Sequence, residues 1–441
     1  MLAPRSRGSA LRALCWLASL ALLAAYVCVF ARYAVNFPRV DDYSQLLAVP
    51  YYVSLEPTVA DALRYLFSLS VEHRIATLRL AALAQARLFG QIDFVALMVA
   101  GAVMLACGLA LVVAQAPRAH RAWIALVAVA LFVSPAHYEA QYWATGALQH
   151  EGVIGLAFAA LWLVARRSPM GNGAGFALAC AAALTSANGI MAFPAGAVLL
   201  WQSGQRRTAA AAAIVSIVAF AVYFAGFDAS GAGSHAVANP LQIVYFMLLG
   251  AGSLAIAAGP SAIGGGALFA VWAWLILTRA RVPPLLAAWA FFLAASFAAM
   301  AAGRSELGED AALLSRYRVY SGAFALVTLS AVLSVIAQQA RLAVGLIAVP
   351  VSLAWLVAST NATMPLVVNT WYAQEITRAT YLSTGHGVYV PWPPQEYGDF
   401  MLDRAAAMGY FKAQASRHLP LPAQTPDTWN ALRCCWSKGM P

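Results

Sequence analysis

The stretch of sequence that decides the fold is RALCWLASLALLAAYVCVFARYAVNFPRVDDY, residues 12–43. Its first part, residues 12–34, is mostly apolar, and about 20 such residues in a helix cross the roughly 30 Å hydrocarbon core of a bilayer. That run is too long for a cleavable signal peptide and predicts a signal anchor. Two adjacent carboxylates, Asp41 and Asp42, follow it closely. The stretch therefore predicts a membrane-spanning helix that ends at an acidic loop.

The whole chain has the composition of a membrane protein. Of its 441 residues, 62% are hydrophobic and 10% are charged, whereas soluble domains are about 45–50% apolar and about 25% charged. This composition excludes a soluble enzyme, a disordered protein and a nucleic-acid-binding domain. The predicted fold class is all-α, a polytopic transmembrane helical bundle.

Apolar runs along the chain predict about eleven crossings, several of them short. Their ranges are 12–34, 93–115, 122–136, 150–166, 173–187, 189–203, 208–227, 261–279, 284–302, 319–338 and 342–359.

Arginine clusters lie at alternate ends of these runs, and the positive-inside rule assigns those ends to the cytoplasm. The N-terminus is then inside and residues 360–441 are outside. The net charge of +10 is therefore attributed to the orientation of the chain in the membrane and not to a nucleic-acid partner. Acidic residues played no part in this assignment, yet all 17 fall on the outer side. Any carboxylate chemistry is therefore expected at the outer face. The clusters are Arg5/Arg7/Arg12, Arg118/Arg121, Arg166/Arg167, Arg206/Arg207, Arg279/Arg281 and Arg341.

Some apolar segments are not predicted to cross the membrane as a single helix. Residues 74–90 are apolar but contain three Arg, which favours an amphipathic helix at the outer interface. Residues 240–258 are Gly-rich and favour a re-entrant or interfacial helix, and residues 185–189 predict a tight outer turn. We expect two parts, a transmembrane domain at 1–359 and a small extracytoplasmic segment at 360–441.

The first candidate site lies in the loop after the first crossing. Mutual repulsion and poor solvation raise the pKa of one carboxyl of a pair such as Asp41-Asp42, making it a proton acceptor near neutral pH. The alternative is a solvated loop in which Asp caps a helix. Further along, Glu72-His73-Arg74 would hold a cation, a phosphate or the Asp pair, or would simply open a helix.

A second outer loop, residues 303–318, carries Arg304, Arg316 and Arg318 beside Tyr317. An outer Arg at a helix end runs against the positive-inside bias and needs a partner. A planar guanidinium suits phosphate oxygens. The alternatives are pairing with Glu309 or Asp310, or contact with lipid headgroups.

Aromatic, amide and acidic side chains gather in residues 137–151, including Glu139, Tyr142 and Trp143. Aromatic rings stack on sugars and amides bond to hydroxyls, but an interfacial aromatic belt has the same composition. His137, Glu139, His150 and Glu151 are possible metal ligands without diagnostic spacing, so a divalent cation stays open.

The order of these features resembles the GT-C superfamily of membrane glycosyltransferases. Members carry an acidic pair in the first outer loop, which Asp41-Asp42 matches, and many then have a helix that opens with His and ends in Leu-Phe-Gly. Here His73 opens a helix ending Leu88-Phe89-Gly90, without the two prolines of the family pattern. Uncharacterised bacterial membrane proteins also look similar around Glu72–Arg74, Ser186–Gly189 and Ser315–Tyr317.

The resemblance implies a GT-C-like bundle that moves a sugar from a polyprenyl-phosphate donor to a hydroxyl acceptor. One Asp would be the general base, and Arg304, Arg316, Arg318 and Arg74 would bind the lipid phosphate. It implies the periplasmic face of a bacterial inner membrane, with membrane lipids as neighbours, an unidentified glycan, lipid or protein acceptor, and no nucleic acid. The candidate substrate-binding residues are Glu72, His73, Glu139, Tyr142, Trp143 and Tyr317.

Two other functions remain open from the sequence. A transporter or flippase for lipid-linked or anionic solutes places charges at mid-membrane between repeats, and no repeat is seen here. A non-catalytic scaffold would act through residues 360–441.

Overall fold

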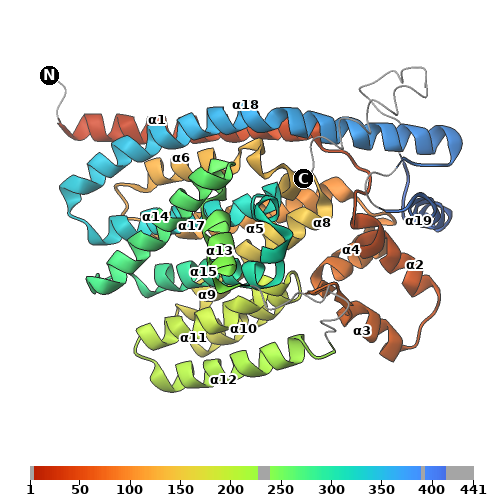
Figure 1. The fold of residues 1–441 in the computed structure, drawn as a ribbon, viewed down its shortest axis with the longest axis horizontal. Helices are drawn as coiled ribbons and strands as arrows, with labels where there is room; N and C mark the ends of the chain where they lie inside the picture. The colour runs from red at the N-terminus through yellow and green to blue at the C-terminus, as the bar shows by residue number, and fades with distance from the viewer. Residues whose placement is uncertain (1–3, 227–238, 389–392, 414–441) are drawn as a thin grey trace.

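The structure is a computed structural model that describes residues 4–226, 239–388 and 393–413. Within these residues the fold is an all-α bundle, as predicted (Figure 1). The strands in this part of the chain form one small hairpin, in which β1 (Leu69–Ser70) pairs antiparallel with β2 (His73–Arg74).

Eight helical segments of the described chain are long and apolar enough to cross a membrane, or nine if one bent pair is a single span. The bent pair is α6 (Arg121–Phe132) with residues Pro135–Gln141, at an angle of 50°. The eight are α1 (Pro4–Tyr33), α5 (Phe94–Gln115), the segment Ala144–Val164, α12 (Arg206–Tyr223), α14 (Ala258–Leu277), α15 (Pro284–Arg304) with its extension to Leu307, α17 (Ser315–Val335) and α18 (Gln338–Thr384).

Each of the eleven predicted runs overlaps a helix, but two of these helices belong neither to the eight candidate spans nor to the bent pair. They are α10 (Pro169–Ala183), with 15 residues, and α11 (Ala192–Gln202), with 11. The count of eleven crossings therefore stays a prediction. The 240–258 segment forms α13 (Pro240–Ala251) and a short turn, η5 (Ser253–Ala255). Its 12 residues rise about 18 Å, less than a bilayer core.

The predicted turn at residues 185–189 lies between α10 and α11 and continues into η4 (Ala187–Met191). Gly189 is required there because a Cβ atom would lie 2.0 Å from the carbonyl oxygen of Ala182. The absence of a side chain lets the turn pack directly on the end of α10.

Short elements gather at one end of the bundle, which we call the capped end. They are η1 (Tyr43–Leu47), α2 (Ala48–Ser54), α3 (Val59–Phe67), the β hairpin, α4 (Ala76–Phe89) and α19 (Gln395–Ala407). Figure 1 shows α2, α3, α4 and α19 together at the right. A hydrophobic core of its own holds this end together, and it joins Phe37 and Leu46 to Ile75 and Leu402.

Two of these helices are amphipathic in different ways. The segment predicted to be interfacial forms α4, which buries Leu78, Ala82 and Ala86 against the protein. By contrast α3 has no buried residue, and Val59, Leu63 and Phe67 are 78%, 51% and 39% exposed. These three are four residues apart and therefore share one face of the helix.

The long helix α18 passes without interruption through the expected domain boundary at 359/360. Its 47 residues rise about 70 Å, more than twice the thickness of a bilayer core. Its last turns therefore extend beyond the apolar helices to the capped end, where α19 packs on η1 and α2. Residues 414–441 of the predicted extracytoplasmic segment lie outside the described residues.

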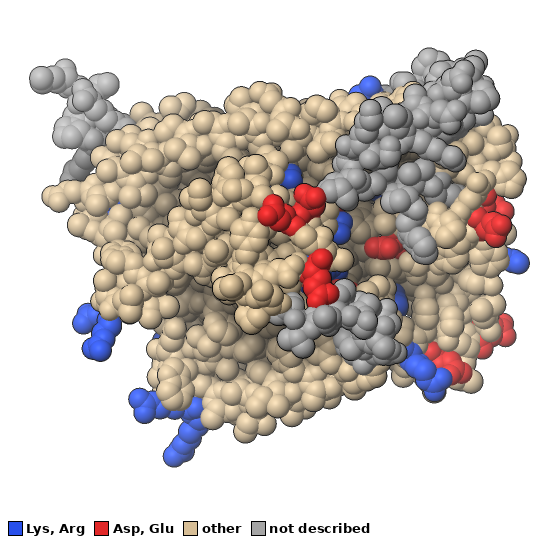
Figure 2. Space-filling model, viewed as in Figure 1, with Lys and Arg blue, Asp and Glu red and all other residues tan. Residues whose placement is uncertain are grey.

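Charges are unevenly distributed over the surface. On the face shown in Figure 2, acidic side chains lie in the half of the molecule toward the capped end, and basic ones alone mark the opposite end. The side of the membrane that each end faces stays a prediction.

Candidate functional site

A polar cavity of about 410 Å³ opens at the capped end. Its walls come from three distant parts of the chain, residues 40–73, 143–150 and 304–317. Seven of the twelve predicted site residues line it: Asp41, Glu72, His73, Trp143, Arg304, Arg316 and Tyr317. Folding thus brings motifs from separate parts of the sequence together around one cavity.

The two carboxylates of the acidic pair have different environments. Asp41 lines the cavity, whereas Asp42 is fully buried behind it. One carboxylate oxygen of Asp42 accepts bonds from the Thr145 backbone N–H (2.9 Å) and hydroxyl (2.6 Å). The other accepts from the Arg39 N–H at 3.0 Å. Asp42 therefore ties its loop to the start of the Ala144–Val164 segment, and Asp41 is the member of the pair that faces the cavity.

Burial also changes the acidity of both groups. It raises the pKa of Asp42 to about 7, against the opposing hydrogen bonds of Thr145 and Arg39. Burial likewise raises the pKa of Asp41 above its ordinary value, although the charges of Arg316 and Arg304 oppose this. No side-chain hydrogen bond to the Asp41 carboxylate is found among the described residues. Asp41 is thus a free carboxylate with increased basicity in the cavity.

Strained backbone precedes both acids of the cavity. Val40 has φ 48° and Val71 has φ 55°, and each stands directly before a lining acid, Asp41 or Glu72. A β-branched side chain disfavours positive φ, at a cost of about 1–3 kcal/mol per residue. The surrounding packing therefore holds both acids where relaxed backbone would not place them.

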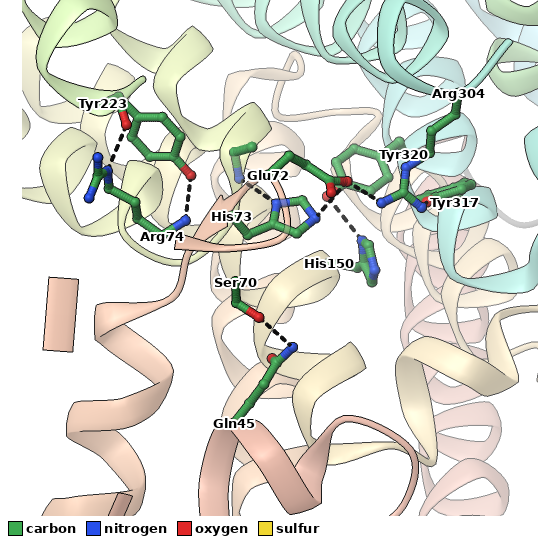
Figure 3. A network of polar contacts seen from close by, with 11 residues as sticks. Gln45, Ser70, Glu72, His73, Arg74, His150, Tyr223, Arg304, Tyr317 and Tyr320 are labelled. Carbon is green, nitrogen blue, oxygen red and sulfur yellow. Dashed lines mark hydrogen bonds and ion pairs between the residues drawn. The ribbon is translucent and has the colours of Figure 1, made fainter. Parts of the chain in front are cut away.

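Glu72 is the centre of a network that Figure 3 shows in close view. Its carboxylate pairs with Arg304, which also donates to the Tyr317 hydroxyl. It lies 3.2 Å from Nε2 of His73. Burial would raise the pKa of Glu72, but hydrogen bonds from His73 and Arg304 and the Arg304 charge lower it well below its ordinary value. Glu72 is therefore ionised and holds Arg304 at the cavity wall.

His73 is held from its other side by the α10–α11 turn. Its Nδ1 accepts the backbone N–H of Ala187 at 3.0 Å. A ring nitrogen that accepts an N–H bond carries no proton, so the ring proton lies on Nε2 and is donated to Glu72. The Glu-His-Arg and Ser-Ala-Asn-Gly motifs, 114 residues apart, thus act together to orient Glu72.

Arg316 has a carboxylate partner of its own. Its Nη1 lies 3.2 Å from Glu139, and the same carboxylate accepts the Ser315 hydroxyl at 2.7 Å. Its guanidinium carbon is 6.0 Å from the centre of the Trp143 ring. Glu139 is therefore not part of the cavity lining but holds Arg316 from behind.

Three of the predicted residues point elsewhere. The Arg74 guanidinium donates to the backbone carbonyls of Tyr223, Phe67 and Ala225, and clamps the end of α12 to the β hairpin. Arg318 is buried and donates to the carbonyls of Ala136 and Leu313. These two Arg have structural bonds in place of a ligand.

Tyr142 does not line the cavity either. It is buried and stacks on Phe30 of α1, with ring centres 5.6 Å apart. It packs the first crossing against the segment that carries Trp143.

Several lining residues had no distinguishing signal in the sequence. Ser44, Gln45 and Ser70 are uncharged residues of common types. Ser44 and Gln45 directly follow the Asp41-Asp42-Tyr43 motif, whereas Ser70 is not part of any motif. Gln149 and His150 stood out for composition alone. A metal site finds no support, since no group of three or more His, Cys, Asp or Glu side chains in the described chain could hold an ion.

Comparison of the chain with protein-family models, curated proteins and solved structures found no match. The cavity is therefore the feature of this chain that points to a function.

Proposed function

We propose that the protein is a membrane glycosyltransferase of GT-C type, acting at the periplasmic face of a bacterial inner membrane. It would move a sugar from a polyprenyl-phosphate donor to a hydroxyl acceptor. The observation that carries this proposal is one cavity, at the end of membrane-length helices, that contains a free carboxylate, Asp41, and two guanidinium groups, Arg304 and Arg316.

The chemistry needs a base on one side of the anomeric carbon and an anion site on the other. Asp41 takes the proton of the acceptor hydroxyl, whose oxygen forms the new bond to the anomeric carbon. The bond from that carbon to the phosphate oxygen breaks, and the electron pair leaves with the lipid phosphate. The anomeric configuration inverts.

Arg304 and Arg316 stabilise the charge that develops on the leaving phosphate. Each guanidinium has five N–H donors in a planar fork. Glu72 and Glu139 fix the two forks, so little reorganisation is needed when the phosphate arrives. Arg304 is the last residue of α15 and Arg316 lies in the first turn of α17. Guanidinium groups at these helix ends suit a donor whose phosphate lies at the level of the lipid headgroups.

The test is turnover by purified, reconstituted protein supplied with polyprenyl-phosphate sugars. Replacement Asp41→Asn should reduce release of lipid phosphate about 100-fold or more, the usual contribution of a general base. Arg316→Gln should also reduce it, because it removes a guanidinium from the phosphate site.

The matched controls lie on α3, outside the cavity, where Asp61 and Arg64 form an exposed pair. Asp61→Asn and Arg64→Gln should leave turnover unchanged. Full activity in Asp41→Asn would refute the proposed mechanism. Uptake of donor into vesicles without release of lipid phosphate would instead identify a transporter.

A further inference from the structure

The helix α3 is held to the protein by one face and turns its apolar residues away from it. Tyr65 stacks on Tyr52 of α2 with ring centres 4.0 Å apart, and the Tyr52 hydroxyl donates to the Asp61 carbonyl at 3.2 Å. The contacts that attach α3 therefore use its polar and aromatic side. Its exposed apolar row, which we call the α3 stripe, consists of Val59, Leu63 and Phe67.

One guanidinium joins the end of α3 to the end of a candidate membrane span. Arg74 donates to the carbonyl of Phe67, the last residue of α3. The same group donates to the carbonyls of Tyr223 and Ala225 at the end of α12, and Figure 3 shows its bond to Tyr223. Because the donors of a guanidinium lie in one planar fork, the carbonyls that it bridges are close together. The α3 and α12 helices thus end at the same level.

The end of α12 marks the boundary of the lipid. This helix is one of the eight candidate spans, and its apolar side chains Ile214, Ile217 and Val222 are exposed on the outside of the bundle. A helix with exposed apolar side chains along its length is typical of a membrane span. By contrast, the nine residues of α3 rise about 14 Å and cannot cross a bilayer core. The α3 stripe is therefore an apolar surface at the level where the lipid ends.

We propose that α3 is an interfacial anchor and that the α3 stripe enters the headgroup boundary of the bilayer beside α12. An amphipathic helix at an interface buries its apolar face about 5–10 Å into that boundary. A protein partner is the poorer occupant, because a stable protein interface takes about 20–30 residues from each side and the stripe offers three. This inference concerns the membrane and does not rest on the proposed reaction.

The anchor is connected to the cavity. Ser68 directly follows α3, and Arg79 binds both its carbonyl and its hydroxyl at 3.0 Å. The β hairpin comes next, and Ser70 and Glu72 of that segment line the cavity. The α3 anchor would therefore fix the cavity wall that carries Glu72 at the membrane surface. The sequence predicted an interfacial helix at residues 74–90, but the structure gives α3 the exposed apolar face.

The experiment places a polarity-sensitive fluorophore on α3 in a background without native cysteines, with the full chain reconstituted in lipid vesicles. Leu63→Cys puts the probe on the α3 stripe. Arg64→Cys is the matched control, because Arg64 is 77% exposed and points about 100° away from Leu63. Spin-labelled lipid should quench the probe at Leu63 about threefold or more above the probe at Arg64, and aqueous iodide should show the reverse order.

Two results would overturn the anchor. Equal quenching by lipid at the two positions would place the α3 stripe outside the bilayer. A probe at Leu63 that is shielded from both lipid and iodide would identify a protein partner instead. If this shielding fades as the protein is diluted in the vesicles, that partner is a second copy of the chain.

Hydrogen exchange of the reconstituted protein provides a second test. Leu63→Asn and Arg64→Asn introduce the same residue on two sides of α3, and Leu and Arg have similar helix propensities. The exposed pair of Arg64 with Asp61 contributes little. Loss of the anchor should therefore make amide exchange across α3 about fivefold or more faster in Leu63→Asn than in Arg64→Asn. Equal exchange rates in the two variants would refute insertion of the α3 stripe.

Discussion

Asp41 and Asp42 are neighbours in sequence with different tasks. Asp42 accepts three hydrogen bonds in a fully buried position, while Asp41 faces the cavity. The sequence identified the pair as unusual but not which member faces a ligand, because that depends on where Thr145 lies. The same holds for Glu72, whose partner Arg304 is 232 residues away.

The titration of Asp42 gives a prediction about stability. Its pKa is raised to about 7 in the fold, against about 3.9 for an unfolded Asp. The folded protein thus binds more protons between these values, and its stability is full below about pH 4 and falls as pH rises through about 7. We expect the thermal midpoint to be higher at pH 5.5 than at pH 8.5, as measured by unfolding in detergent.

The variant Asp42→Asn should be less stable at acidic pH and should lose part of this pH dependence. The exposed Asp61→Asn is its control and should keep the whole dependence. An unchanged slope in Asp42→Asn would assign the effect to another group.

At the scale of elements, two short turns decide the geometry of the site. The turn between α10 and α11 holds His73 through the Ala187 N–H, and η1 contributes Ser44 and Gln45 to the cavity lining. The apolar runs predicted the helices well, because the length of an apolar run can be read from neighbouring residues alone. They did not predict the π-helical turns η1 and η3 (Ala147–Gly152), which depend on packing.

Glycine substitutions test the α10–α11 turn. Gly189→Ala would drive a Cβ atom to within 2.0 Å of the Ala182 oxygen, so we expect a loss of about 1–3 kcal/mol or more of stability. The displaced Ala187 N–H should also raise KM for the donor. Gly173→Ala, in α10 with open space around it, should be neutral or stabilise by about 0.5–1 kcal/mol. Thermal unfolding and steady-state kinetics measure both, and equal effects at the two sites would contradict the prediction.

At the scale of the whole molecule, residues that follow α1 and residues near the C-terminal end of the described chain together build the capped end. Met401, Leu402 and Ala405 of α19 share a hydrophobic core with Phe37 and the residues of η1. The sequence suggested a division at 359/360, but the continuous α18 shows no break there. The C-terminal part thus supports the loop that carries Asp41.

Leu402→Ala tests that support. Leu402 is fully buried, so its truncation should cost about 2–5 kcal/mol and lower turnover with it. Leu382→Ala makes the same chemical change at a position that is 46% exposed, and its cost should be well below that range. Chemical denaturation of the purified proteins provides the comparison. Equal losses would show that α19 does not stabilise the capped end.

The orientation of the bundle is also testable. The Arg clusters predict that the α11–α12 turn is cytoplasmic and that the loop near Leu307 is periplasmic. In a background without native cysteines, Leu307→Cys should react with a membrane-impermeant maleimide in intact cells. Gln202→Cys should react only after lysis. The reverse pattern would invert the topology and move the cavity to the cytoplasmic face.

The sequence by itself determined the class of the fold, the approximate helices and the residue types of the site. Each of these follows from local composition, since an apolar run of about 20 residues forms a membrane-length helix whatever its neighbours. Only the tertiary structure decided that Asp41 and not Asp42 faces the cavity, that Arg74 and Arg318 lie outside it and that Gln45 and Gln149 line it. The physical reason is that a helix turns about 100° per residue, so the direction of a side chain and the partner it meets depend on how distant helices pack.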